Sequence, residues 1–229
     1  ISACLVGSEM CIRDRSTAAA TRDRIQMTHT RTVPPGNTLA PWATIVPGIG
    51  PMTVDELAAL PDDGWQYELV EGVLVRMPPS GQRAARIARR LAARLGDFVD
   101  AQNLGNVTGP DGGYTLGPRT DLAPDVGFIQ AARLPPLDSP DYDKLAAGAP
   151  DLAVEIASPN QYRPGMGAKA QRYLNAGTHL VWVIWPRRQQ VEVWHPTGKQ
   201  PSDTLGVGDM LDGEDVVPGF SYPVADLFS

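Results

Sequence analysis

Apolar side chains recur at every third or fourth position between residues 82 and 101, which is the spacing of one face of an α-helix. The positions that make this stripe are Ile87, Leu91, Leu95 and Phe98. The pattern therefore predicts one long helix over residues 82–101 that packs its apolar stripe against a core.

Two shorter segments carry helix signals at their ends. In residues 52–60, Thr53 is a suitable N-cap, and Glu56 three positions later completes a capping box. Residues 167–176 predict another helix, which Gly177 ends.

Strand patterns lie on both sides of these helices. Residues 67–77 form two alternating runs hinged at Glu71-Gly72, which predicts a β-hairpin. Residues 180–194 predict a second hairpin, which turns around residues 186–188. Residues 150–157 are almost continuously apolar, as expected for a central strand buried on both faces.

Shorter strands are predicted at 106–108, 113–116, 123–130, 204–205 and 208–211, with a final turn at 224–228. The loop at 131–148 is rich in proline and aspartate and is long enough to act as a lid or specificity loop. Because strands and helices alternate irregularly, the expected fold class is α/β (α+β): a mixed β-sheet flanked by helices, with β-hairpins in the N- and C-terminal parts.

The N-terminal segments differ from the rest of the chain. Residues 1–15 resemble translated sequencing-adapter DNA, so we expect them to be non-native, and Met27 is a candidate start. Residues 16–50 are rich in Thr, Pro, Gly and Ala without apolar periodicity, which predicts a flexible lead-in. Residues 51–229 then have the length of a single domain with a sizeable core.

Charge and cysteine content narrow the function classes. The chain has 20 Lys and Arg against 26 Asp and Glu, a net charge of −6, which argues against a general nucleic-acid coat protein. Both cysteines, Cys4 and Cys11, lie in the segment expected to be non-native. Disulfides and thiolate metal sites are thus not expected in the domain, which fits a reducing cytoplasm. No apolar run is long enough for a membrane helix.

Two acidic residues lie in or beside apolar strand segments. Asp125 is within the run 123–129, and Glu155 is within the run 152–157. Burying a carboxylate is unfavourable unless something neutralises it, and a divalent cation would relieve the repulsion between two neighbouring carboxylates. The alternative is that backbone donors or water satisfy both acids.

Several arginines lie on one side of the predicted long helix, beside its apolar stripe. A solvated helix face is one explanation, and contact with phosphate groups is the other. The arginines on this face are Arg83, Arg86, Arg90 and Arg94.

Seven short motifs occur in order along the chain, at 67–72, 77–80, 123–126, 154–159, 169–177, 181–186 and 217–220. Together they resemble the Uma-type family of putative restriction endonucleases, a bacterial group with the PD-(D/E)xK nuclease fold. The resemblance covers roughly residues 52–229 and implies a restriction endonuclease-like sheet and a metal-dependent DNA endonuclease.

The resemblance also implies roles for four residues. Asp125 and Glu155 would hold Mg²⁺ or Mn²⁺ on adjacent strands, and Glu68 would complete the acidic cluster. A lysine normally follows two positions after the second acid, but Ala157 stands there. Lys169, at the family's own lysine position on the next helix, is the expected substitute.

Three hypotheses remain at this point: a metal-dependent DNA nuclease, a domain with the same fold that binds DNA or a protein without cleaving, and a metal-free carbohydrate hydrolase built on two carboxylates. The last lacks an aromatic-rich cleft in the sequence, since the tryptophans gather mainly in the 182–194 hairpin. These tryptophans are typical of either core or a dimer surface, and we expect the hairpin to be exposed and to offer an apolar surface for a homodimer.

Overall fold

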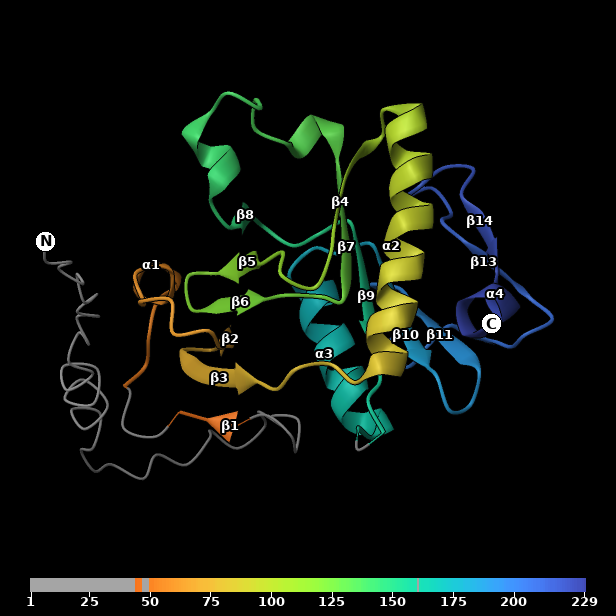
Figure 1. The fold of residues 1–229 in the computed structure, drawn as a ribbon, viewed down its shortest axis with the longest axis horizontal. Coiled ribbons are helices and arrows are strands. Elements are labelled where there is room, and N and C mark those ends of the chain that lie inside the picture. The colour runs from red at the N-terminus through yellow and green to blue at the C-terminus, as the bar shows by residue number, and fades with distance from the viewer. Residues whose placement is uncertain (1–43, 47–49, 160) are drawn as a thin grey trace, which may run out of the picture.

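The computed structural model describes residues 44–46, 50–159 and 161–229. Two mixed sheets stand side by side in it, with the longest helix in front of one of them (Figure 1). The predicted α+β class, with hairpins in both parts of the chain, is confirmed.

The N-terminal sheet has the strand order β1-β3-β2-β6-β5-β8. Its strands are β1 (Thr44–Ile45), β2 (Gln66–Val70), β3 (Val73–Met77), β5 (Tyr114–Gly117), β6 (Thr120–Leu122) and β8 (Ala146–Ala147). The predicted hairpin is β2–β3, and Glu71 and Gly72 have φ of 50° and 85°, the left-handed values that its two-residue turn requires. β1 pairs with β3, so the sheet begins inside the segment expected to be a flexible lead-in. Residues 16–43 and 47–49 of that segment, and the predicted non-native residues 1–15, lie outside the described residues.

The second sheet has the strand order β12-β11-β10-β9-β7-β4. Its strands are β4 (Gly105–Thr108), β7 (Val126–Gln130), β9 (Leu152–Ile156), β10 (Leu180–Trp185), β11 (Gln190–Trp194) and β12 (Asp203–Leu205). β9 is buried along its whole length and pairs with β10 in parallel and with β7 in antiparallel fashion. The prediction of a central strand there is confirmed.

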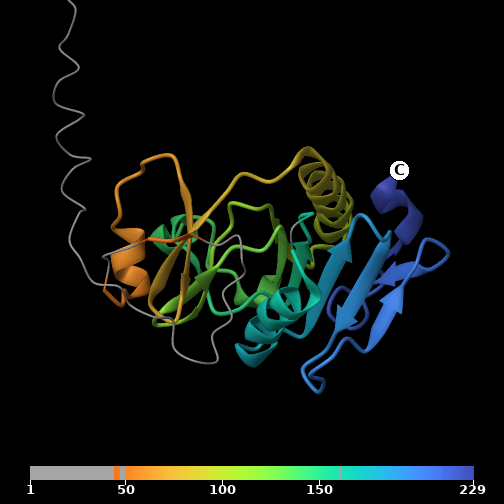
Figure 2. The ribbon, with the colours of Figure 1, turned by 90° about the horizontal axis from the view of Figure 1, so that it is seen from below.

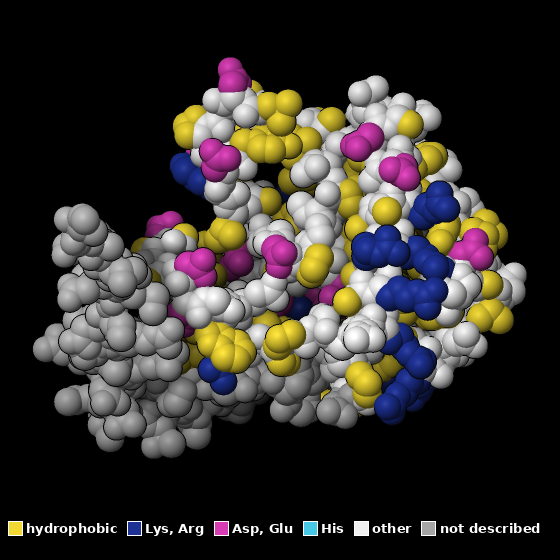
Figure 3. Space-filling model, in the orientation of Figure 1, with side chains coloured by type: hydrophobic (Ala, Val, Ile, Leu, Met, Phe, Trp, Pro, Cys, Tyr) yellow, Lys and Arg dark blue, Asp and Glu magenta, His cyan; other side chains and the backbone are white. Residues whose placement is uncertain are grey.

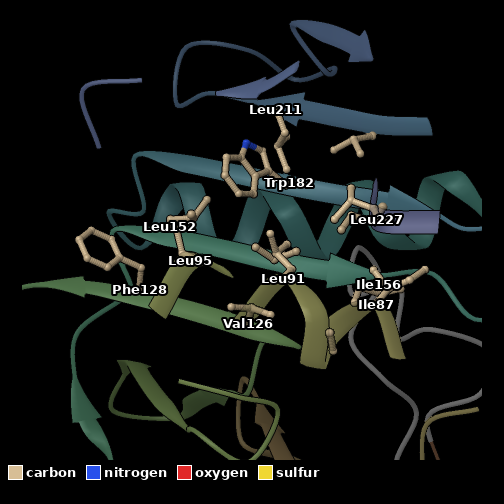
Figure 4. Close-up of a cluster of buried hydrophobic side chains, with 14 of the residues drawn as sticks. Ile87, Leu91, Leu95, Val126, Phe128, Leu152, Ile156, Trp182, Leu211 and Leu227 are labelled. Carbon is tan, nitrogen blue, oxygen red and sulfur yellow. The ribbon is translucent and has the colours of Figure 1, made fainter. Parts of the chain in front are cut away.

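Two helices cover opposite faces of this second sheet (Figure 2). On one face lies α2 (Gln82–Gln102), whose buried side chains include Ile87, Leu91 and Leu95. Figure 4 shows them against strand residues such as Val126, Ile156 and Trp182. Val99 rather than Phe98 completes the fully buried stripe, while Phe98 is partly buried against Phe220.

The opposite face of the sheet packs on α3 (Arg163–Asn175). This helix begins four residues before the predicted start at 167, and Arg163 is its first residue. Pro164 suits the first turn of a helix. Gly167 lies against Trp194, and a Cβ at this position would be 3.0 Å from the ring, so the ring would have to move to accommodate it.

The remaining elements pack around these layers. α1 (Val54–Ala58) has the predicted Thr53 cap and capping box. The predicted lid contains two short 3-10 turns, η2 (Ala131–Arg133) and η3 (Pro140–Asp143), and then β8. The chain finishes with β13 (Met210–Asp212), β14 (Ser221–Pro223) and α4 (Val224–Phe228), which close the core beside α2.

The tryptophan side chains of the β10–β11 hairpin are inside the protein. Trp182, Trp185 and Trp194 are 0%, 6% and 4% exposed. The expectation that this hairpin offers an apolar dimer surface is therefore wrong, because both of its faces are covered by α2, α3 and the C-terminal elements. None of the described helices is long and apolar enough to cross a membrane.

Candidate active site

Strand alternation aims Glu155 at α3. Val154 and Ile156 contact the α2 core, so the residue between them points to the opposite face of the sheet. On that face Ala153 and Ala157 belong to the cluster that includes α3 side chains. Glu155 is 4% exposed and meets Lys169 and Tyr173, one helical turn apart on α3.

Asp125 reaches the same place from the neighbouring strand. It directly precedes β7, which runs antiparallel to β9 with Val126 opposite Val154. Asp125 therefore lies beside the end of β9, and its Oδ2 accepts a 2.7 Å hydrogen bond from the Ile156 backbone N–H. Backbone satisfaction, the alternative raised from the sequence, thus holds for one oxygen of Asp125.

Lys169 joins the two sheets. Its Nζ lies 2.8 Å from Glu68 Oε1 on β2 and 2.9 Å from Glu155 Oε1 on β9. Glu68 Oε1 also accepts a hydrogen bond from the Ala123 N–H at 3.3 Å. The structure thus brings together all four residues to which the resemblance assigns catalytic roles: Glu68, Asp125, Glu155 and Lys169.

Burial sets the protonation behaviour of this cluster. It raises the pKa of Glu155, and the Asp125 and Glu68 charges add to the rise while Lys169 opposes it. It also raises the pKa of Asp125, against the Ile156 hydrogen bond and Lys169. Burial disfavours charge on Lys169, but attraction to Glu155 and Glu68 outweighs this effect and raises its pKa above the ordinary lysine value.

Two site residues were missed by the sequence analysis. The Tyr173 hydroxyl donates to Glu155 Oε1 at 2.9 Å, although the residue reads from sequence only as a buried helix position. Asp121, on β6, is 3% exposed, and its Oδ1 has no hydrogen-bond partner among the described residues. Burial and the nearby Glu68 charge raise the pKa of Asp121 to about 6. An acid within the short run 120–122 was the available signal, but β6 itself was not predicted.

These groups line a cleft of about 820 Å³ between the two sheets, a size typical of ligand sites. Eight carboxylate residues and two lysines line it. The predicted lid loop contributes Asp143, Lys144 and Leu145 to one wall. Trp65, 46% exposed, lies at the cleft with the Arg76 guanidinium 4.2 Å from its ring centre.

The donor atoms at the cleft suit a hard cation. Within the described part of the chain, Asp125 Oδ1 and Glu155 Oε2 accept no hydrogen bond, so each carboxylate keeps one oxygen for another partner. Mg²⁺ prefers such oxygens and is commonly bound by one or two carboxylates plus water. No group of three or more His, Cys, Asp or Glu side chains among the described residues is arranged to hold a metal by itself. The fit therefore rests on the Asp125–Glu155 pair.

Basic side chains form a line along the outer side of the long helix (Figure 3). The four predicted arginines, here called the α2 arginine stripe, are Arg83, Arg86, Arg90 and Arg94. Arg83, Arg86 and Arg94 are exposed. Arg90 is half-buried and donates to the Asp226 carbonyl at 2.6 Å and to Ser229 Oγ, so it also ties α4 to α2.

Comparison with known proteins agrees with this architecture. Residues 54–225 match the model of the Uma2 family, described as "putative restriction endonuclease". The fold is similar to the crystal structure, at 1.96 Å resolution, of a putative nuclease belonging to DUF820 from Anabaena variabilis ATCC 29413. The TM-score is 0.66 at 22% identity, over 78% of this chain and 98% of that one. No curated protein sequence matches. The family and the fold predicted from the motifs are both confirmed.

Proposed function

The chain belongs to the Uma2 family of putative restriction endonucleases, and from this membership we propose that it is a Mg²⁺- or Mn²⁺-dependent endonuclease hydrolysing phosphodiester bonds in DNA. The family match supports a nuclease in general. The observation that carries the finer proposal is the meeting of Asp125, Glu155 and Lys169, from three separate elements, at one cleft.

In this proposal Asp125 and Glu155 hold the cation through their remaining oxygens. The bound ion would supply charge neutralisation at the phosphate and a water of lowered pKa. The acid-rich lining of the cleft supports a bound cation. Without one, the eight carboxylate residues would repel a phosphodiester that enters the cleft.

Lys169 is the proposed positive group beside the scissile phosphate. An ammonium has three donors, and its contacts with Glu68 and Glu155 use two of them. The third is available for a phosphate oxygen or the attacking water. Tyr173 holds Glu155 in its orientation through the 2.9 Å hydrogen bond, and Glu68 does the same for Lys169.

The test measures cleavage and metal binding separately. Wild type, Asp125→Asn and Glu155→Gln are assayed on plasmid and single-stranded DNA with Mg²⁺ or Mn²⁺, and Mn²⁺ binding is measured by calorimetry. We expect both variants to lose cleavage and saturable Mn²⁺ binding. Asp143→Asn, which removes an exposed carboxylate from the same cleft, is the matched control and should keep both activities.

Undiminished Mn²⁺ affinity in both site variants would refute the metal assignment. DNA binding by wild type without cleavage under any metal condition would instead support the alternative, a nuclease-fold domain that binds DNA or a protein partner without cutting.

A further inference from the structure

A second pocket lies next to the acidic cleft, at the carboxyl ends of the parallel strands β9 and β10. It measures about 500 Å³. Three parts of the chain enclose it: the start of α2 at 81–84, residues 157–159 and 161 after β9, and the β10–β11 turn at 185–188. Open α/β sheets commonly bind ligands at the carboxyl ends of their parallel strands.

The lining of this pocket has the opposite charge to the cleft. Arg83, Arg187 and Arg188 line it, all three are exposed, and no acidic residue does. The cleft next to it is lined by eight carboxylate residues. Guanidinium groups match phosphate geometry through paired N–H donors, so an anion with several oxygens is the ligand class that this pocket suits.

The backbone supplies further donors at the same pocket. α2 begins here after Gly81, which makes no side-chain cap, so the first backbone N–H groups of a 21-residue helix lack a capping side chain. Trp185 also lines the pocket, where the Arg188 guanidinium lies 5.6 Å from its ring centre.

The pocket and the cleft share a wall. Ser158 and Gln161 line both, and the Ser158 N–H donates to Gln161 Oε1 at 2.6 Å. A group bound in the pocket is therefore separated from the cleft by the wall that Ser158 and Gln161 form. Arg83 also begins the α2 arginine stripe, which leads away from the pocket along the protein surface (Figure 3).

We propose that this pocket binds a backbone phosphate of the DNA strand, next to the phosphodiester that lies in the acidic cleft. The inference rests on the proposed nuclease function. The cleft carries eight carboxylate residues against two lysines, so attraction for the strand has to come from cations beside it. The arginines of the neighbouring pocket supply these cations. By holding one phosphate of the strand, they set which phosphate reaches Asp125 and Glu155.

The test compares the full chain carrying Arg187→Gln/Arg188→Gln with Arg119→Gln/Lys199→Gln, which removes the same charge from exposed positions that line neither pocket. Binding of a fluorescent single-stranded DNA is measured at several salt concentrations without divalent metal. We expect the pocket variant to bind roughly tenfold or more weakly. The slope of log K against log salt should flatten by about 0.7, which corresponds to one phosphate contact. The control pair should match wild type.

A second readout follows the indole N–H resonance of Trp185, assigned by its loss in Trp185→Phe. It should shift when DNA is added to wild type or to the control pair, and stay in place in the pocket variant. Cleavage by wild type with an unchanged slope in the pocket variant would overturn the pocket and leave the nuclease assignment intact. Weaker DNA binding and a flatter salt slope in the pocket variant, without cleavage by wild type, would support the pocket and overturn hydrolysis. No DNA binding by wild type would overturn both proposals.

Discussion

Replacing Lys169 with methionine removes the ammonium group that bridges Glu68 and Glu155 while keeping a side chain of similar length. The three side chains are nearly enclosed, with exposures of 13% for Lys169, 7% for Glu68 and 6% for Glu155. Removing one partner of a buried ion pair typically costs about 3–5 kcal/mol, because the remaining charge is left uncompensated. A single domain has about 5–15 kcal/mol of stability in total, so this loss would be a large fraction.

The cost should depend on pH in a definite direction. Burial already raises the pKa of Glu155, and Lys169 is the main group that lowers it. Without Lys169 the folded protein keeps a proton on this carboxyl at a pH where the unfolded chain has released it. A raised carboxyl pKa contributes stability that is complete below the unfolded pKa and is lost as pH rises through the folded pKa. Lys169→Met should therefore be destabilised more at pH 8 than at pH 5.

Urea unfolding followed by tryptophan fluorescence at both pH values measures this difference. The matched control is Lys144→Met, which removes an exposed lysine paired with the exposed Asp141, and it should unfold like wild type. Adding Glu68→Gln to Lys169→Met should restore part of the stability, because one of the unpaired carboxylates is removed. A loss below about 1 kcal/mol at pH 8, or an equal loss at both pH values, would refute the account of Lys169 as the buried counter-ion.

Three other outcomes are expected. Asp121→Asn should gain stability relative to wild type by up to about 3 kcal/mol as the pH rises from 4 to 7. The pKa of about 6 means that ionising Asp121 in the folded protein is unfavourable, so wild type loses stability over this range. Parallel stability-against-pH curves for the two proteins would contradict this. Tyr173→Phe should lose about 1–3 kcal/mol in urea unfolding, because Glu155 loses a buried donor, and wild-type stability would argue against that hydrogen bond. Replacing the α2 arginine stripe with glutamine should flatten the salt dependence of duplex binding by about 0.9 per lost phosphate contact, and an unchanged slope would make the stripe a solvated surface.

Much of the architecture could be predicted because it is encoded locally. The apolar period over 82–101 predicts α2, the Thr53–Glu56 capping box predicts the start of α1, and Glu71-Gly72 predicts the β2–β3 turn. Each signal depends on residues within a few positions of one another, where backbone geometry and side-chain spacing decide the outcome. Asp125 and Glu155 were identifiable for a similar reason, since an acid in an apolar strand segment stands out from its neighbours.

The contacts that define the site are not local, and only the tertiary structure decided them. Lys169 and Glu68 are 101 positions apart and meet because α3 lies between the two sheets. α3 begins at Arg163 although its first turns contain Pro164, Gly165 and Gly167, and tertiary packing buries this part of the helix, with Met166 in the core. The β10–β11 tryptophans are core because α2 and α3 cover opposite faces of their sheet. In the same way the arginine pocket forms only where three segments distant in sequence come together. The order of the elements along the chain does not determine which strand ends are neighbours in the sheet.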